Sequence, residues 1–325
     1  MSSQPALASV FGSIEGDLAS VEKKIQKALQ HEDKLLSSVA THLQKAGGKR
    51  MRPALVLLCG RIWGEPPPVL TELAAAVEII HMATLVHDDV IDDADIRRGW
   101  PTVNSQWNSE LSILTGDFLF ATAFCLLANS GDNRLVRLMA EVVYEMSAGE
   151  ITQLASTGVL EQDEAEYFDR IEKKTSIFIA SCCELGGLAA GGSQKEAQVL
   201  RAFGHGIGMG FQIVDDVLDF TASPQRLGKP VGNDLTSGVI TLPVIHALQS
   251  PAHGGRLAEL IADGVKPEQV GEVVAVLEEA GSFTYALAKA AAFVSDAKRQ
   301  LLFLPPSRAR QSLEEMADFI VHRDH

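Results

Sequence analysis

Apolar residues recur every three or four positions along most of this chain, which is the spacing of one face of an α-helix. The segments that show it are rich in Ala, Leu, Glu, Lys and Gln, all of which favour helix. The pattern predicts helices over residues 14–43, 70–93, 112–129, 133–154, 163–190, 195–220, 235–248, 256–263, 267–280, 283–303 and 306–322. No stretch shows the alternation of polar and apolar residues that is typical of a strand.

Glycine and proline mark the joints between these segments, as at Gly47-Gly48 and Gly191-Gly192. No linker or break in composition divides the chain, and 46% of its 325 residues are hydrophobic, enough for a substantial core. We therefore predict a single all-α domain over residues 1–325, folded as a helical bundle around a central cavity.

The formal net charge of −14 argues against a nucleic-acid partner, because phosphate backbones bind positively charged surfaces. An anionic substrate would have to be held by locally placed Lys, Arg or metal ions. The N-terminal residues lack the pattern of a secretory signal, and no apolar run approaches the roughly 18 residues that span a bilayer. We expect a cytoplasmic protein in which the four cysteines, Cys59, Cys125, Cys182 and Cys183, are small buried side chains.

Two aspartate clusters share the spacing D-D-x-x-D inside segments that are predicted to be helical. The first is Asp88, Asp89 and Asp92, and the second is Asp215, Asp216 and Asp219. On a helix, positions i, i+1 and i+4 crowd one side, so the carboxylates of each cluster repel one another. A multivalent cation would relieve the repulsion, and Mg²⁺ prefers oxygen ligands and is readily shared with substrate phosphates. Two such helices facing each other could hold a diphosphate between them.

A solvated helix face is the alternative interpretation of either cluster, because acidic pairs are common on exposed helices. Two copies inside otherwise apolar helices favour the metal site, since buried carboxylates without partners are costly. Residues 221–238 follow the second cluster and are rich in turn-forming residues, so they are either a lid over the site or a plain surface loop.

Several short blocks occur in a fixed order along the chain, and each alone would be a weak signal. They are residues 47–53 (GGKRMRP), 81–93 (HMATLVHDDVIDD) continuing to Arg97-Arg98-Gly99, 115–117 (TGD), 149–153 (GEITQ), Lys174-Thr175, 211–219 (FQIVDDVLD), and 228–232 (GKPVG) with Asp234-Leu235. Together they make the chain resemble the trans-type polyprenyl diphosphate synthases from end to end. Within that family it is most similar to the catalytic large component of bacterial heptaprenyl diphosphate synthase.

The resemblance implies an Mg²⁺-dependent chain elongation, with three Mg²⁺ ions per active site. An allylic diphosphate, such as farnesyl diphosphate, loses its diphosphate, and the double bond of isopentenyl diphosphate attacks the resulting cation before a proton is lost. Metal ions and fixed cations would neutralise the departing diphosphate. An apolar cavity would keep water from the carbocation.

The same resemblance assigns roles to particular residues. The aspartates Asp88, Asp89, Asp92, Asp215, Asp216 and Asp219 would hold the metal ions and, with Lys174, act in catalysis. The allylic diphosphate would be bound by Arg97, Lys174, Thr175, Gln212 and Lys229, and the isopentenyl diphosphate by Lys49, Arg52, His81 and Arg98.

Three of these assignments have a plainer alternative when the residues are taken alone. Arg97-Arg98 and Lys49-Arg50 could be solvated surface residues, and His81 could be a core histidine. The chain also departs from the family at Val239, where Lys is frequent, so one cationic contact to the allylic diphosphate is missing.

Small residues before the first cluster bear on product length. In the family, bulky side chains four and five residues before the first aspartate cap the pocket for the growing chain, and here these residues are Thr84 and Ala83. The resemblance therefore implies a long-chain product, of about heptaprenyl length, that serves menaquinone biosynthesis. Ala83 could instead only pack against a neighbouring helix.

The resemblance also implies a homodimer, or a heteromer with a small non-catalytic subunit. Two rival functions stay open, a class I terpene cyclase and the non-catalytic subunit of a heteromeric synthase. The complete second D-D-x-x-D and the cations for a second diphosphate disfavour the cyclase. The intact aspartates disfavour the non-catalytic subunit.

Overall fold

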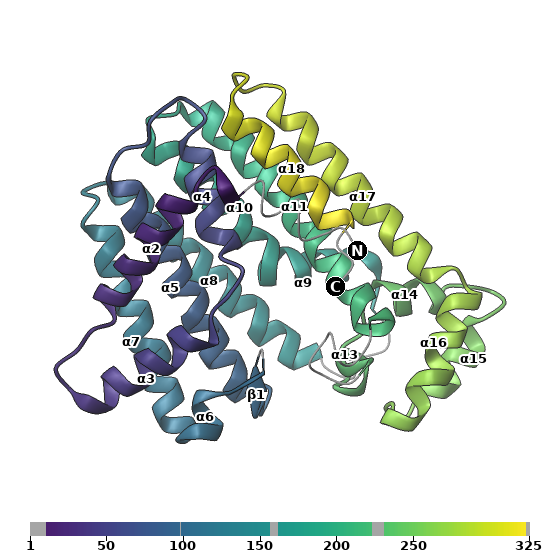
Figure 1. The fold of residues 1–325 in the computed structure, drawn as a ribbon. Coiled ribbons are helices and arrows are strands. Elements are labelled where there is room, and N and C mark those ends of the chain that lie inside the picture. The colour runs from purple at the N-terminus through teal and green to yellow at the C-terminus, as the bar shows by residue number, and fades with distance from the viewer. Residues whose placement is uncertain (1–10, 98, 157–161, 223–230, 323–325) are drawn as a thin grey trace.

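The structure is a computed structural model that describes residues 11–97, 99–156, 162–222 and 231–322, and almost all of its regular elements are helices (Figure 1). The first half contains α2 (Glu15–Ala28), α3 (Lys34–Ala46), α4 (Met51–Gly60), α5 (Val69–Ile91), α6 (Val103–Gln106), α7 (Ser109–Ala128) and α8 (Asn133–Ser156). The second half contains α9 (Glu164–Ile171), the π-helix η1 (Glu172–Ser176), α10 (Ile177–Ala189), α11 (Gln194–Thr221), α13 (Asn233–Thr236), α14 (Leu242–Leu248), α15 (Gly254–Ile261), the 3-10 helix η2 (Pro267–Gln269), α16 (Val270–Glu279), α17 (Ser282–Leu301) and α18 (Arg308–His322). The predicted all-α class is confirmed.

One small hairpin interrupts the helical pattern in the described part of the chain. Strands β1 (Ile96–Arg97) and β2 (Trp100–Pro101) pair antiparallel, with Ile96 opposite Pro101 and Arg97 opposite Trp100. The hairpin follows the first aspartate cluster directly, so it sets where Arg97 lies.

Most predicted helices are present, and four differences have physical reasons. The segment 14–43 is two helices, because Asp33 caps α3 by accepting the N–H groups of Leu35 and Leu36. The helix α4 was not predicted, since its residues 53–60 are all buried and therefore show no polar face. The segment 163–190 contains the π-helix η1, and the segment 235–248 divides into α13 and α14.

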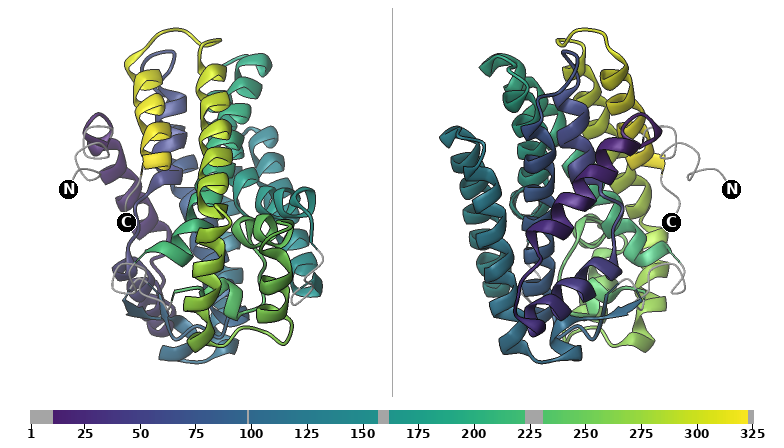
Figure 2. Two further views of the ribbon diagram at one scale, coloured as in Figure 1. Left: turned by 90° about the vertical axis from the view of Figure 1, so that its right-hand side faces the viewer. Right: turned by 60° about the vertical axis from the view of Figure 1, so that its left-hand side comes forward.

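The helix α11 is the centre of the bundle, packing along α10 on one side and α17 on the other, while α5 packs against α7, α4 and α2. The axes of most of the longer helices are roughly aligned with one another (Figure 2). The buried apolar residues form two clusters, one around α5 and α10 and one around α14, α16 and the second half of α11. The prediction of a single domain over residues 1–325 stays a prediction.

Four glycines at every second position allow α11 to pack this closely. A Cβ at Gly204 or Gly208 would lie 2.6 or 2.7 Å from backbone atoms of α10 and η1, and one at Gly206 or Gly210 would lie 2.8 or 2.6 Å from atoms of α17. Glycine in a helix costs about 1 kcal/mol relative to alanine, so close packing on both sides must offset this cost. The glycines fix α11 against its neighbours just before the second aspartate cluster.

Two helices are long and apolar enough to cross a membrane by length and composition, α5 and α7, contrary to the expectation that no apolar stretch reaches that length. In the most apolar 18-residue stretch of each helix, 67% of the stretch is buried inside the protein for α5 and 39% for α7. Core helices of proteins outside membranes pass the same test, so this is weak evidence of a span. The outward side of α7 is nevertheless apolar, and Cys125 on it is exposed, which corrects its predicted burial.

Candidate active site

The first aspartate cluster lies at the C-terminal end of α5. Asp88 and Asp89 are in its last turn, and Asp92 follows as the exposed C-cap, with its N–H bonded to the carbonyl of Asp88 at 2.8 Å. The chain turns away because Asp93 takes a left-handed conformation (φ +49°), and the N–H of Ala94 then bonds to the carbonyl of Asp89. Carboxylates at this end of a helix face the negative pole of the helix dipole. The position therefore favours a bound cation.

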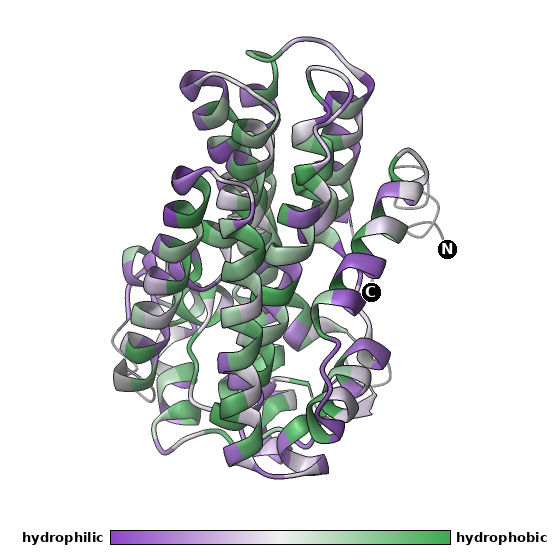
Figure 3. Ribbon diagram, turned by 90° about the vertical axis from the view of Figure 1, so that its left-hand side faces the viewer, coloured by the Kyte–Doolittle hydropathy of each residue, from purple (hydrophilic) through white to green (hydrophobic). Residues whose placement is uncertain are grey.

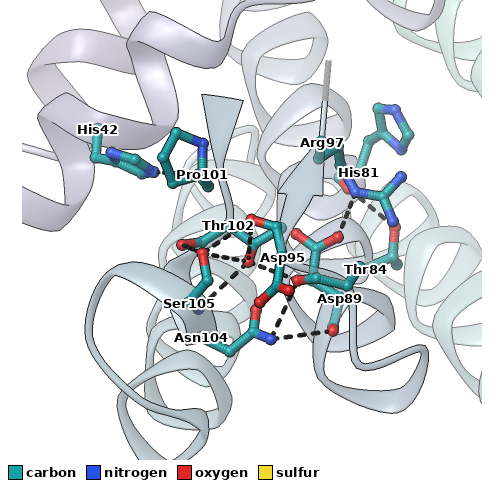
Figure 4. A network of polar contacts seen from close by, with 11 residues as sticks. His42, His81, Thr84, Asp89, Asp95, Arg97, Pro101, Thr102, Asn104 and Ser105 are labelled. Atoms are coloured by element: carbon teal, nitrogen blue, oxygen red, sulfur yellow. Dashed lines mark hydrogen bonds and ion pairs between the residues drawn. The ribbon is translucent and has the colours of Figure 1, made fainter. Parts of the chain in front are cut away.

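Arg97 neutralises Asp89 from the β-hairpin. Its Nε donates to Oδ1 of the buried Asp89 at 2.5 Å (Figure 4). The turn that carries Arg97 is fixed by Thr102, whose hydroxyl donates to the carbonyl of Ala94 at 2.7 Å, and by Asn104, whose amide donates to the same carbonyl at 3.2 Å. Arg97, assigned to the allylic diphosphate, thus lies beside the first cluster, and its role in binding stays a prediction.

Asp88 lies among charges from three other elements. Burial raises the pKa of Asp88 to about 6, because removal from water disfavours the charged carboxylate. Lys174 and Arg97 lower this pKa, whereas Glu150 and Asp92 raise it. The end of α5 is therefore close to α8, which carries Glu150, and to η1, which carries Lys174.

The second cluster lies in the last two turns of α11. Asp215 is half-buried, and Asp216 and Asp219 are buried. Oδ2 of Asp219 accepts the N–H of Asp234 at 3.1 Å, and the carbonyl of Asp219 accepts the N–H of Gly232 at 2.8 Å. These bonds tie the start of α13 to the end of α11.

Asp216 is held by two neutral donors. The hydroxyl of Tyr167 donates to Oδ2 at 2.7 Å, and the amide of Gln212 donates to Oδ1 at 2.8 Å. The pKa of Asp216 is raised to about 7, first by burial and then by the neighbouring carboxylates of Asp234 and Asp215, although the two hydrogen bonds lower it. The site therefore has an excess of negative charge around this carboxylate.

The π-helix η1 connects the two clusters. Lys174 acts on Asp88 and lies 3.6 Å from Oε2 of Glu150, and the next residue, Thr175, donates its hydroxyl to Oε1 of Gln212 at 2.7 Å. Because Gln212 in turn bonds to Asp216, the two aspartate helices meet at one short element. π-helical turns are frequent at functional sites. The structure thus brings Lys174, Thr175 and Gln212 together, and their role in binding the allylic diphosphate stays a prediction.

Two of the residues assigned to isopentenyl diphosphate, His81 and Arg52, have contacts that locate them. His81 lines a small pocket of about 50 Å³ between α3, α5 and the hairpin, together with Gly47, Arg50, Asp89 and Arg97. Arg52 lies half-buried with its guanidinium carbon 5.0 Å from the ring centroid of Phe178. The turn that carries Lys49 therefore borders the pocket, close to both His81 and Arg97.

Arg98 and Lys229 lie outside the described residues, as do residues 223–230 of the predicted lid over 221–238. Ala83 is fully buried, and half-buried Thr84 donates its hydroxyl to the carbonyl of His81 at 2.9 Å. One turn further along α5, the ring of His87 lies 5.8 Å from that of Phe120 on α7. The helix α5 thus contacts an aromatic side chain of α7 one turn after the two small residues.

The donor set fits a divalent cation. All six cluster residues offer hard carboxylate oxygens, and burial disfavours the charged form of Asp88 and Asp216 unless a cation is present. Within the described ranges, no three His, Cys, Asp or Glu side chains come close enough to hold a metal ion among themselves. Ligands from a substrate diphosphate would complete the coordination, as the preference of Mg²⁺ for shared phosphate oxygens allows.

Four residues of this region were missed by the sequence analysis: Arg50, Glu78, Tyr167 and Arg170. Glu78 is a charged residue in the apolar run of α5, so its burial beside Arg50 had a visible signal. Arg50 and Arg170 carried no signal that separates them from surface arginines. The buried Tyr167 had none either, because the partner that explains it is 49 residues away in the sequence.

Comparison with known proteins agrees with this geometry. The family model described as polyprenyl synthetase matches residues 33–280. Heptaprenyl diphosphate synthase component 2 of Geobacillus stearothermophilus is 41% identical, covering 98% of this chain and 99% of the relative. The short chain isoprenyl diphosphate synthase of Methanothermobacter thermautotrophicus is 38% identical, covering 89% and 91%.

A solved structure of a polyprenyl synthase has the same fold as this chain. The crystal structure of polyprenyl synthase from Caulobacter crescentus CB15, complexed with calcium and isoprenyl diphosphate, superposes with a TM-score of 0.92 at 32% identity, covering 98% of both chains. The fold and the two carboxylate clusters thus define an all-α isoprenoid synthase. The chain belongs to the polyprenyl synthetase family and is a prenyltransferase that makes polyprenyl diphosphates.

Proposed function

We propose that this chain elongates an allylic diphosphate with isopentenyl diphosphate, in a Mg²⁺-dependent head-to-tail reaction, to an all-trans product of about heptaprenyl length. The observation that carries the proposal is the chain of contacts from Asp88 through Lys174 and Thr175 to Gln212 and Asp216. It gives one short element, η1, access to both carboxylate clusters. A single diphosphate could then be reached by both.

Each group of residues has a part in this reaction. The six aspartates would hold Mg²⁺, which when bound supplies positive charge to the leaving diphosphate. Lys174, Thr175, Gln212, Arg97 and Lys229 would orient the allylic diphosphate, and Lys49, Arg52, His81 and Arg98 would hold isopentenyl diphosphate with its double bond toward the allylic carbon. The apolar side chains between α5 and α7 would keep water from the carbocation.

Product length is proposed from Ala83 and Thr84, because overall similarity does not decide it. A heptaprenyl synthase component and a short-chain synthase are 41% and 38% identical to this chain, which is nearly the same. Ala83 and Thr84 carry no bulky side chain that would cap the pocket, so the product would be longer than a farnesyl group. Use of the product in menaquinone biosynthesis belongs to the same proposal.

An apolar outer surface supports the proposed partner subunit. On α7, Ile113 and Leu114 are 47% and 64% exposed, and on α8, Tyr144 and Ile151 are 71% and 69% exposed. Figure 3 shows apolar residues interspersed with polar ones along the helices on the α2 and α7 side. Large exposed apolar side chains on neighbouring helices are typical of subunit contacts. We propose a homodimer, or a heteromer with a small non-catalytic subunit, in the cytoplasm.

The test is elongation of farnesyl diphosphate with labelled isopentenyl diphosphate and Mg²⁺, with the products sized by chromatography, in the presence and absence of a candidate partner. Asp88→Asn and Asp215→Asn should each lower kcat by at least about 10²-fold. Asp169→Asn is the matched control, because Asp169 lies in the exposed i,i+4 pair with Lys173 next to η1. No elongation under either condition, or equal activity of all three variants, would refute the proposal.

A further inference from the structure

Tyr167 is a fully buried residue of α9 with a defined hydrogen bond at its polar end. Its ring packs edge-on against Phe168, with centroids 5.4 Å apart, and its hydroxyl donates to Oδ2 of Asp216 at 2.7 Å. A buried hydroxyl needs a partner, so this bond sets the rotation of the phenol group. The bond also limits the rotation of the Asp216 carboxylate.

The other oxygen of Asp216 is fixed by an amide whose orientation is itself determined. Gln212 donates its NH₂ group to Oδ1 at 2.8 Å, and its Oε1 accepts the hydroxyl of Thr175 at 2.7 Å. The carboxylate of Asp216 can only accept, so the NH₂ group of Gln212 must face it, and the amide oxygen then faces the hydroxyl of Thr175, which donates to it. Each carboxylate oxygen thus receives one neutral donor, and neither oxygen is hydrogen-bonded to a fixed cation.

A cation that could have neutralised Asp216 is directed elsewhere. The guanidinium of Arg170 lies 5.5 Å from the ring centroid of Tyr167, but it donates to the carbonyl of Ile240 and to Oε1 of Gln162. Arg170 acts on Asp216 through its charge, but the hydrogen bonds to the Asp216 carboxylate among the described residues come from the neutral Tyr167 and Gln212. Asp216 is therefore oriented by neutral donors, unlike Asp89, which pairs directly with Arg97.

We propose that Tyr167 is a positioning residue, whose hydroxyl acts together with Gln212 to hold the Asp216 carboxylate in the orientation that accepts a divalent cation. This inference rests on the proposed function of the aspartate clusters. Hydrogen-bond partners of metal-binding carboxylates typically change metal affinity by about 10–100-fold when removed. A purely structural tyrosine would instead affect folding alone.

The test compares Tyr167→Phe with Tyr285→Phe. Tyr285 also donates its hydroxyl to a carboxylate, that of Glu164, which has no assigned role at the metal site. In Tyr167→Phe, the Mg²⁺ concentration for half-maximal activity should rise about 10–100-fold, while kcat at saturating Mg²⁺ stays within a few-fold of the wild type. Tyr285→Phe should leave the Mg²⁺ dependence unchanged.

A second readout does not depend on turnover. The rise in melting temperature on adding Mg²⁺ with inorganic diphosphate should require about 10–100-fold more Mg²⁺ in Tyr167→Phe than in the wild type. If Tyr167→Phe melts earlier but needs no additional Mg²⁺, the positioning role is wrong and the proposed function stands. If neither the wild type nor the variants respond to Mg²⁺ with diphosphate, the proposed function fails and this inference fails with it.

Discussion

Glu78→Gln should destabilise the protein and weaken its binding of isopentenyl diphosphate, because Glu78 anchors the turn between α3 and α4. Glu78 is only 3% exposed, and its Oε1 accepts Nη1 of Arg50 at 2.7 Å. Arg50 has a left-handed conformation (φ +51°), follows Lys49 directly and precedes Arg52 by two residues. The ion pair thus holds a strained residue between two side chains that are assigned to the substrate.

The expected destabilisation by Glu78→Gln follows from the burial of its ion pair. A hydrogen bond to a charged group contributes about 1.5–3 kcal/mol, and Gln keeps the shape of Glu78 while removing its charge. Arg50 retains its contacts with Glu22, whose side chain is 45% exposed, so the loss should stay below the 3–5 kcal/mol that is typical of a fully broken buried pair. We expect a decrease of about 2 kcal/mol in the free energy of unfolding and a melting temperature lower by on the order of 5 °C.

Glu72→Gln is the control, because Glu72 lies on the same helix and pairs with Lys24 of α2 at 2.6 Å, but with both side chains about 30% exposed. Glu72→Gln should lower the free energy of unfolding by about 0–1 kcal/mol. Urea denaturation measures both variants. Steady-state kinetics should show a KM for isopentenyl diphosphate about tenfold higher in Glu78→Gln, corresponding to about 1.4 kcal/mol, with the KM for the allylic substrate unchanged. Equal destabilisation by the two variants, or equal changes in both KM values, would show that the reasoning is wrong.

Three further predictions concern product length, pH and assembly. Ala83→Phe should shorten the product, because a ring would replace a small buried side chain, and an unchanged length distribution would remove Ala83 from the pocket. In metal-free protein the melting temperature should fall as pH rises from about 4 to 7, because burial raises the pKa of Asp216 to about 7, above its ordinary 3.8, so that folding favours the neutral form. Saturating Mg²⁺ should abolish this fall, and a melting temperature that rises across the range would contradict the pKa shift. Leu114→Asp should produce monomers in sedimentation velocity. The control Leu302→Asp should not, although Leu302 is 65% exposed and Leu114 is 64% exposed. Identical behaviour of the two variants would exclude α7 from the subunit contact.

The helices could largely be predicted from the sequence, because amphipathic spacing reports which face is buried. This signal fails where burial is complete, as in α4, and where a single local contact decides, as at Asp33. It also cannot show the one-residue expansion of η1, since a π-helix and an α-helix present nearly the same apolar pattern. The pattern therefore predicts long helices better than their interruptions.

The candidate site was predictable in its charged motif and not in its supporting contacts. Two D-D-x-x-D clusters stand out because carboxylates are costly in apolar helices. Tyr167 reaches Asp216 from another helix, and Arg50 reaches Glu78 across 28 residues. Such contacts arise from tertiary packing, which the periodicity of a single helix does not contain.

The structure also accounts for an anionic substrate on a chain with a net charge of −14. Three cations near the candidate site are already paired with carboxylates: Arg97 with Asp89, Lys174 with Glu150, and Arg50 with Glu78. Pairing orients these side chains but cancels part of the positive field that a diphosphate would meet. Fixed cations alone are therefore a weak attraction here. The charge needed at Asp88 and Asp216 must arrive with the substrate, which is the physical reason to expect diphosphate and metal to bind together.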